Sequence, residues 1–247
     1  MKKDQSLAQG DPVAFQTAEA QAGSHAHRLN SLRAAVLGAN DGIVSTAGIV
    51  IGVAGATPDF APILVAGVAG LTAGALSMAV GEYVSVSAQR DSEMALLEKE
   101  RRELEEMPEE ELAELAGLYE EKGLTPELAL EVATQLHEHD ALAAHAETEL
   151  GIDPNELTSP TVAAISSAIA FTVGSALPLA AILLAPADIK IPVTAIGVLL
   201  ALALTGYLSA RAGGTPVLRA MIRNVLGGFL AMGVTYWIGR LVGISIG

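Results

Sequence analysis

Residues 35–56 read AVLGANDGIVSTAGIVIGVAGA, a run of small and apolar side chains that contains one carboxylate, Asp41. About 20 such residues in a helix cross the roughly 30 Å hydrocarbon core of a bilayer. An ionised aspartate at the centre of a membrane helix costs about 2.5–3.5 kcal/mol on insertion scales. Because that cost has to be offset, the run predicts a membrane helix in which Asp41 has a function.

The composition of the whole chain also favours a membrane protein. The 247 residues are 51% hydrophobic and 17% charged, with a mean hydropathy of +0.45, whereas soluble domains carry about 25% charged residues. No cysteine is present, which excludes disulfides and thiolate metal sites. Five segments are long and apolar enough to span a bilayer, at roughly 33–55, 62–88, 161–185, 191–210 and 217–239.

The negative charge is concentrated in one segment between the second and third spans. Residues 91–156 contain 21 acidic and four basic residues, a net charge of −17, whereas the rest of the chain has a net charge of +3. An excess of acid makes nucleic acid an improbable partner, since nucleic-acid binding relies on basic residues. Divalent cations are the partners that such a segment favours.

The positions of the basic residues predict the orientation in the membrane. With a cytosolic N-terminus, twelve of the fourteen Lys and Arg residues face the cytosol, and only Lys190 and Arg240 lie outside. This distribution follows the positive-inside rule. It places the acidic segment in the cytosol and the C-terminus outside. The N-terminal residues lack the apolar core of a signal peptide, so they are interpreted as a polar tail in which His25 and His27 are given no role.

The acidic segment itself is predicted to be helical. The second span continues without a helix breaker to about residue 107, so one long helix should leave the membrane. Proline at the first helical position and a terminal glycine predict two further helices, over 108–122 and 126–150. Their apolar residues recur at the helical period and so share one face of each helix, which lets the three helices close into a small bundle.

The predicted fold is therefore an all-α membrane protein with five transmembrane helices and a cytosolic three-helix acidic domain inserted between helices 2 and 3. The boundaries follow from the pattern: a polar tail over 1–30, transmembrane helices 1 and 2 over 31–90, the metal-binding helical domain over 91–157, and transmembrane helices 3 to 5 over 158–247.

Candidate ligands in the spans lie near Asp41 and in the second span. On a helix, Asp41 shares a face with Ser45, and the spacings of four between Gly38 and Gly42 and between Gly48 and Gly52 let helices approach closely. In the second span, Met78 and Glu82 are four residues apart and lie on one helix face. A thioether beside carboxylates favours a divalent metal of intermediate softness, such as Fe²⁺, over Mg²⁺ or Ca²⁺.

The acidic segment offers several pairs of ligands at helical spacing. Such pairs place two side chains on one helix face, as in carboxylate-bridged metal sites of helical bundles. A solvated helix face is the alternative for any single glutamate. Since most of these acids lack basic partners, close packing of the helices would be repulsive without cations. The predicted metal ligands are Glu100, Glu103, Glu111, Glu114, His145, Glu147 and Glu149.

Three motifs resemble the vacuolar iron transporter family of plants and fungi and its bacterial relatives. They are ANDGIVS (39–45), SMAVGEYVS (77–85) and EHDALAAHAETELGI (138–152), and the resemblance extends from about residue 28 to 244. It implies a homodimeric carrier in a membrane, here the bacterial plasma membrane. Such a carrier moves Fe²⁺, often also Mn²⁺, out of the cytosol in exchange for protons. It also implies that Asp41 and Met78 line the ion path and that the inserted domain binds metal through its glutamates.

The sequence departs from the family pattern at two positions. Gly70 stands where plant members have a carboxylate two turns before the path methionine, so Glu82 is the acid that remains in this span. His145 stands where plant members supply methionine, which exchanges a soft ligand for a borderline one. The alternative function is a membrane-anchored ferritin-like iron oxidase. That enzyme needs Glu-x-x-His pairs on two helices, which the sequence lacks, so a transporter and not an enzyme is expected.

Overall fold

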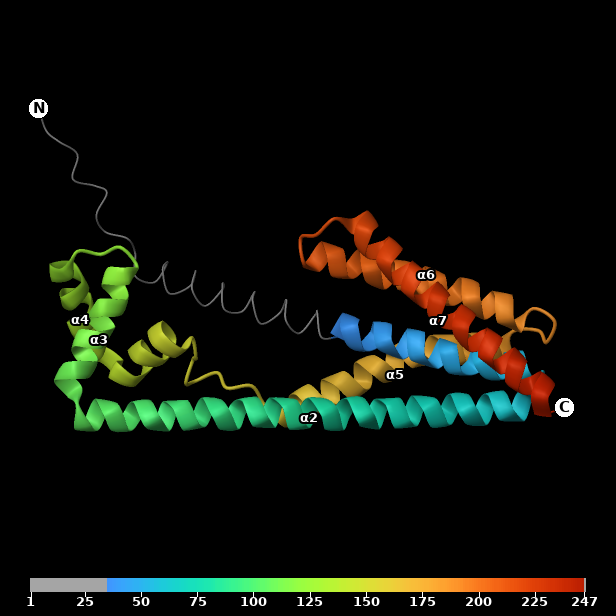
Figure 1. Cartoon of the computed structure of the whole chain (residues 1–247), viewed down its shortest axis with the longest axis horizontal. Helices are drawn as coiled ribbons and strands as arrows, with labels where there is room; N and C mark the ends of the chain where they lie inside the picture. Colours follow the sequence, from blue (N-terminus) through green and yellow to red (C-terminus); the bar gives the residue numbers. More distant parts are fainter. Residues whose placement is uncertain (1–34, 247) are drawn as a thin grey trace, which may run out of the picture. The chain divides into compact units, whose positions relative to one another are not determined.

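The computed structural model describes residues 35–246, and it is entirely helical within that range (Figure 1). The N-terminal tail, including His25 and His27, lies outside the described residues. The described helices comprise the first span Ala35–Ala56, α2 (Phe60–Glu106), α3 (Pro108–Glu121), α4 (Pro126–His145), the π-helical turn η1 (Ala146–Leu150), α5 (Pro160–Leu184), α6 (Lys190–Ala212) and α7 (Val217–Ile246).

Five of these helices are long and apolar enough to cross a membrane: the first span, α2, α5, α6 and α7. Each begins within two residues of the start of a predicted span, so the multi-pass membrane protein expected from the sequence is confirmed. The predicted long helix is also present, because α2 continues for 47 residues. The chain divides into two compact units, which are described separately below.

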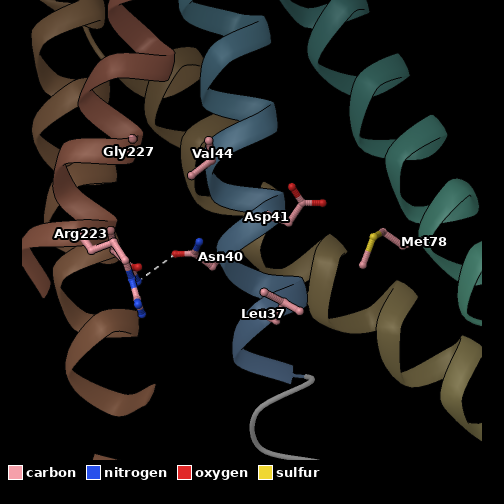
Figure 2. Close-up of a pocket in the computed structure, with 9 residues that line it drawn as sticks. Leu37, Asn40, Asp41, Val44, Met78, Arg223 and Gly227 are labelled. Atoms are coloured by element: carbon pink, nitrogen blue, oxygen red, sulfur yellow. Dashed lines mark hydrogen bonds between the residues drawn. The ribbon is translucent and has the colours of Figure 1, made fainter. Parts of the chain in front are cut away.

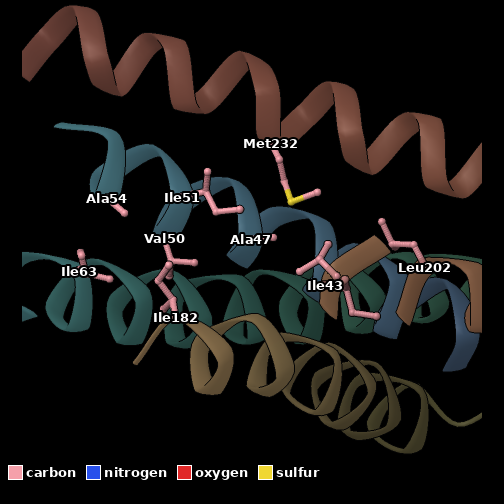
Figure 3. Packing of buried hydrophobic residues seen from close by; sticks show 10 residues of the cluster. Ile43, Ala47, Val50, Ile51, Ala54, Ile63, Ile182, Leu202 and Met232 are labelled. Carbon is pink, nitrogen blue, oxygen red and sulfur yellow. The ribbon is translucent and has the colours of Figure 1, made fainter. Parts of the chain in front are cut away.

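The membrane unit contains residues 35–79 and 165–246, and its core is built around the first span. Ala47 and Val50 of the first span are fully buried, and they pack with Ile182 of α5, Leu202 of α6 and Met232 of α7 (Figure 3). Lys190 at the start of α6 fixes the connection after the first span, because its Nζ donates to the carbonyl oxygen of Pro58 at 2.6 Å. The helix that carries Asp41 is thus the central helix of this unit.

Small residues bring the first span into contact with two other helices. A Cβ atom at Gly174 of α5 would lie 2.1 Å from the carbonyl oxygen of Ala39. A Cβ atom at Gly239 of α7 would lie 1.8 Å from the carbonyl oxygen of Gly52. Neither position has room for any side chain. Within the predicted glycine spacings, a Cβ atom at Gly42 would lie 2.2 Å from the carbonyl oxygen of Phe171 in α5, and one at Gly52 would lie 3.2 Å from that of Thr235 in α7. The predicted close approach is therefore confirmed at these two glycines.

The acidic unit, Val80–Ala164, comprises the rest of α2, α3, α4, η1 and the first turn of α5. Leu115 and Ala116 of α3 pack against Ala133 of α4 in a small core. The ends of α3 are as predicted, with Pro108 in its first turn and Gly123 at a φ of +102° just beyond it. An L-residue at that φ would be strained, so glycine ends the helix here.

The single helix predicted over 126–150 is wrong in its second half. Asp140 has non-helical backbone angles, φ −159° and ψ 93°, and its Oδ1 accepts a hydrogen bond from the backbone N–H of Ala143 at 3.0 Å. Aspartate favours this capping interaction, which competes with the helical backbone. After the kink the chain runs through His145 into the π-helical turn η1, which ends at Gly151 with φ +66°. Before the kink, the buried residues of α4 are Ala129 and Ala133, while Leu128 is exposed.

Candidate functional site

A pocket in the membrane unit contains Asp41 and Met78 (Figure 2). Its volume is about 550 Å³, and its lining comes from the first span, α2 and α7. In Figure 2 the Asp41 carboxylate and the Met78 thioether point toward one another from neighbouring helices. The lining residues are Leu37, Asn40, Asp41, Val44, Met78, Arg223, Asn224, Gly227 and Gly228.

Local hydrogen bonds orient the helix around Asp41. Ser45 Oγ donates to the backbone carbonyl of Asp41 at 2.7 Å, so the predicted Asp41–Ser45 face exists. The carboxylate itself is exposed to the pocket. An oxygen ligand and a sulfur ligand therefore face one space, which is a donor set for a divalent ion of intermediate softness.

A polar cluster beside Asp41 was not predicted from the sequence. Asn40 Oδ1 accepts hydrogen bonds from Thr205 Oγ1 of α6 at 3.1 Å and from Asn224 Nδ2 of α7 at 3.3 Å. The three residues join the first span to two helices at the depth of the pocket. The signal that could have revealed them is an asparagine in each of two predicted membrane spans, since buried amides need partners.

Glu82 lies one helical turn beyond Met78 on α2, as its spacing requires, but it does not line the pocket. It is partly exposed and belongs to the acidic unit. Two of the three predicted ligands, Asp41 and Met78, thus line the pocket, and Glu82 does not. A role for Glu82 stays a prediction.

The acidic unit contains a second cluster, in which Glu100 of α2, Glu111 of α3 and His145 of α4 converge. One ligand atom from each lies within 4.8 Å of the others. His145 Nδ1 is 3.0 Å from Glu100 Oε1 and 3.6 Å from Glu111 Oε2, and Glu149 Oε2 lies 3.9 Å away. The cluster is shielded from water, with His145 0%, Glu100 2% and Glu111 5% exposed.

The buried polar atoms of this cluster lack hydrogen bonds. Neither nitrogen of His145 has a partner among the described residues, and neither does Glu100 Oε1, because their 3.0 Å contact lacks hydrogen-bond geometry. Orphaned buried polar atoms are rare and need an explanation, of which a bound ion is one. Carboxylate oxygens and an imidazole nitrogen within 4.8 Å fit a single divalent cation.

The protonation of the cluster is shifted by its burial. Burial, together with the neighbouring carboxylates of Glu149 and Glu111, raises the pKa of Glu100 to about 7. Burial also raises the pKa of Glu111 and of Glu149, with Glu114 as the next contributor to each. The pKa of His145 is lowered by burial and then by His137. The three carboxylate shifts disfavour negative charge that a cation would stabilise, whereas the lowered pKa of His145 favours the neutral imidazole that can bind a metal.

The other predicted ligands of the acidic segment lie outside this cluster. Glu103 forms an ion pair with Lys99 at 2.5 Å. Glu114 is exposed, although its charge reaches Glu111 and Glu149. Glu147 is exposed on η1. A direct ligand role for these three stays a prediction.

The structure adds His137 of α4 to the surroundings of the cluster. Its ring is 6.0 Å from that of His145, centroid to centroid, and its Nδ1 is buried without a hydrogen-bond partner within residues 35–246. The sequence signal was the spacing of eight residues between the two histidines. The kink at Asp140, which was not predicted, lies between them.

Comparisons with known proteins place the chain in a family. The sequence model of the VIT family matches residues 32–240. The chain belongs to the VIT family. It is 46% identical over 215 residues to a vacuolar iron transporter of Acanthamoeba castellanii, which covers 85% of this chain and 78% of the relative.

Plant relatives extend the comparison over most of the chain. The chain is 36% identical over 220 residues to vacuolar iron transporter homolog 4 of Arabidopsis thaliana, covering 89% of this chain and 87% of the relative. It is 35% identical over 244 residues to vacuolar iron transporter homolog 1 of Oryza sativa subsp. japonica, covering 94% and 87%. The family suggested by the three sequence motifs is thus confirmed.

The raised pKa of Glu100 predicts that metal binding to the acidic unit depends on pH. A carboxylate must lose its proton to bind metal, and the Glu100 pKa of about 7 lies above the ordinary value of 4.5. The affinity of the acidic unit for metal should therefore reach its maximum above pH 8. Protonation of Glu100 alone should lower that affinity by about tenfold at pH 6. Calorimetric titration of the purified full-length protein with Mn²⁺ measures this change. Equal affinity at pH 8 and pH 6 would contradict it.

Proposed function

We propose that the protein transports divalent metal, Fe²⁺ and also Mn²⁺, out of the cytosol in exchange for protons. The observation that carries the proposal is the pair of Asp41 and Met78 in one pocket of the membrane unit. Membership of the VIT family supports it, as do relatives that are named vacuolar iron transporters. Asp41 is an acid in an apolar span, where ionisable residues mark ion pathways.

The two ligands have complementary roles in this proposal. The Asp41 carboxylate neutralises part of the charge of an entering cation and takes up a proton when the cation leaves. Each charge state of the aspartate is therefore used once per cycle. The Met78 sulfur is a soft donor, which favours Fe²⁺ over Mg²⁺ and Ca²⁺. Arg223 lines the same pocket, so a cation is stabilised there only when Asp41 is ionised.

The acidic unit acts as a metal-capture domain in the same proposal. Its segment 91–156 carries a net charge of −17, which raises the local concentration of cations and their rate of encounter. The buried cluster of Glu100, Glu111 and His145 supplies a defined site. Glu103, Glu114, Glu147 and Glu149 then add negative potential around it.

The proposed orientation places the acidic unit and the N-terminus in the cytosol. Arg90, Arg211 and Arg219 then face the cytosol, whereas Lys190, at the opposite end of α6 from Arg211, faces outward. Membrane lipid is the surrounding partner. A homodimer is part of the proposal, because the exposed Asp41 carboxylate suits an arrangement in which a second copy completes the pocket.

Replacement of Asp41 by asparagine tests the role of the carboxylate. Asp41→Asn keeps the shape of the side chain but removes its charge, so Fe²⁺ transport into liposomes should fall to the level of protein-free vesicles. Asp59→Asn is the matched control, because Asp59 lies in the exposed connection after the first span and should leave transport unchanged. Uptake by Asp41→Asn at the rate of the original protein would refute the role.

Cysteine labelling tests the orientation, since the chain has no cysteine of its own. Gln135 of α4 and Asp188 between α5 and α6 are both exposed. In intact cells an impermeant thiol reagent should label Asp188→Cys and leave Gln135→Cys unlabelled until the cells are opened. The reverse pattern would overturn the proposed topology.

A further inference from the structure

His137 is a half-buried histidine whose Nδ1 atom is buried, and it lies outside the metal site proposed so far. It lies on α4 before the kink at Asp140, whereas His145 lies after it. The two rings are 6.0 Å apart and nearly perpendicular, with an interplanar angle of 76°. The kink and the contact between the two histidine rings together place a second imidazole beside the cluster of Glu100, Glu111 and His145.

The chemistry of the buried atoms favours a cation between the two rings. A neutral imidazole has one N–H donor and one nitrogen lone pair. His137 Nδ1 and both nitrogens of His145 lack hydrogen-bond partners within the described part of the chain. When they are ionised, Glu100 and Glu111 can only accept hydrogen bonds, so in that state they cannot satisfy an imidazole lone pair. A metal ion can accept the lone pair and the carboxylate oxygens together.

The separation of the two rings and the charge of these groups are compatible with one ion, although the ligand atoms of His137 lie outside the Glu100, Glu111 and His145 group, whose atoms are within 4.8 Å of one another. Metal–nitrogen bonds are about 2.0–2.1 Å, so two imidazoles on one ion have centroids roughly 5–6 Å apart. The observed 6.0 Å is at the upper end of that range. Glu100 and Glu111 are the most buried carboxylates of the cluster. Two carboxylates and two neutral imidazoles neutralise a divalent cation, which lowers the cost of burial.

We propose that His137 is a direct ligand of the ion held by Glu100, Glu111 and His145, and that this second nitrogen ligand shifts the site toward Fe²⁺, Co²⁺ and Zn²⁺ and away from Mn²⁺. Imidazole suits the former ions, whereas sites built from carboxylates suit Mn²⁺. The inference rests on the proposed metal-capture role of the acidic unit and specifies which ions that unit selects.

The first test compares metal affinities of the full-length protein in detergent. His137→Gln should weaken Co²⁺ binding at least tenfold and Mn²⁺ binding less than threefold. The ratio of the two affinities is the informative quantity, because every nitrogen and oxygen site binds Co²⁺ more tightly than Mn²⁺. His139→Gln is the matched control, since His139 is exposed on the same helix and should change neither affinity. An equal loss for both ions would show that His137 only positions other groups, and no loss would also overturn the proposal.

The second test detects coordination directly and does not depend on the stability of the first variant. The chain contains no cysteine, so His137→Cys introduces a single thiol. If position 137 reaches the ion, Co²⁺ should produce a thiolate-to-metal charge-transfer band in the near ultraviolet. His139→Cys should show no such band. Absence of the band in His137→Cys, with Co²⁺ bound, would contradict the inference.

These measurements separate this inference from the proposed function. They report on binding and coordination and use no transport assay. A protein that binds Co²⁺ through position 137 but moves no iron would refute the transporter proposal and leave the ligand assignment intact. A protein that transports iron while both tests fail would refute the ligand assignment and leave the transporter proposal intact.

Discussion

The organisation of both sites depends on the cost of placing carboxylates where water is scarce. Asp41 lies in the most buried of the five candidate spans, although its own side chain reaches a pocket. Glu100 and Glu111 are held together in the buried cluster of the acidic unit. Like charges in such places repel one another, and their ionised forms are stable only beside a cation or after protonation. A protein that binds and releases divalent ions uses both states.

Most of the fold could be predicted because its determinants are local. The lengths of the apolar runs set the five candidate spans, and glycine spacings anticipated the close contacts of the first span with α5 and α7. Pro108 and Gly123 marked the ends of α3 correctly, since each acts through its own backbone. The shared pocket of Asp41 and Met78 matches a pairing that the family resemblance had implied.

The features that were missed depend on contacts between distant residues or on competition within the backbone. Asp140 caps a new helical segment instead of continuing α4, so helical periodicity failed beyond it. The Asn40 cluster requires α6 and α7 to be placed beside the first span. Glu103 was predicted as a ligand and forms an ion pair with Lys99, so a direct ligand role for it stays a prediction. Spacing identifies which acids share a face, whereas packing decides which of them are buried.

We propose that this chain moves Fe²⁺ across a membrane in exchange for protons. The most direct measurement is Fe²⁺ flux into liposomes that contain the purified protein, with and without an imposed pH gradient. Exchange of Fe²⁺ for protons should make uptake faster when the liposome interior is acidic, and proton efflux should accompany it. Uptake no faster than in protein-free liposomes under either condition would contradict the claim.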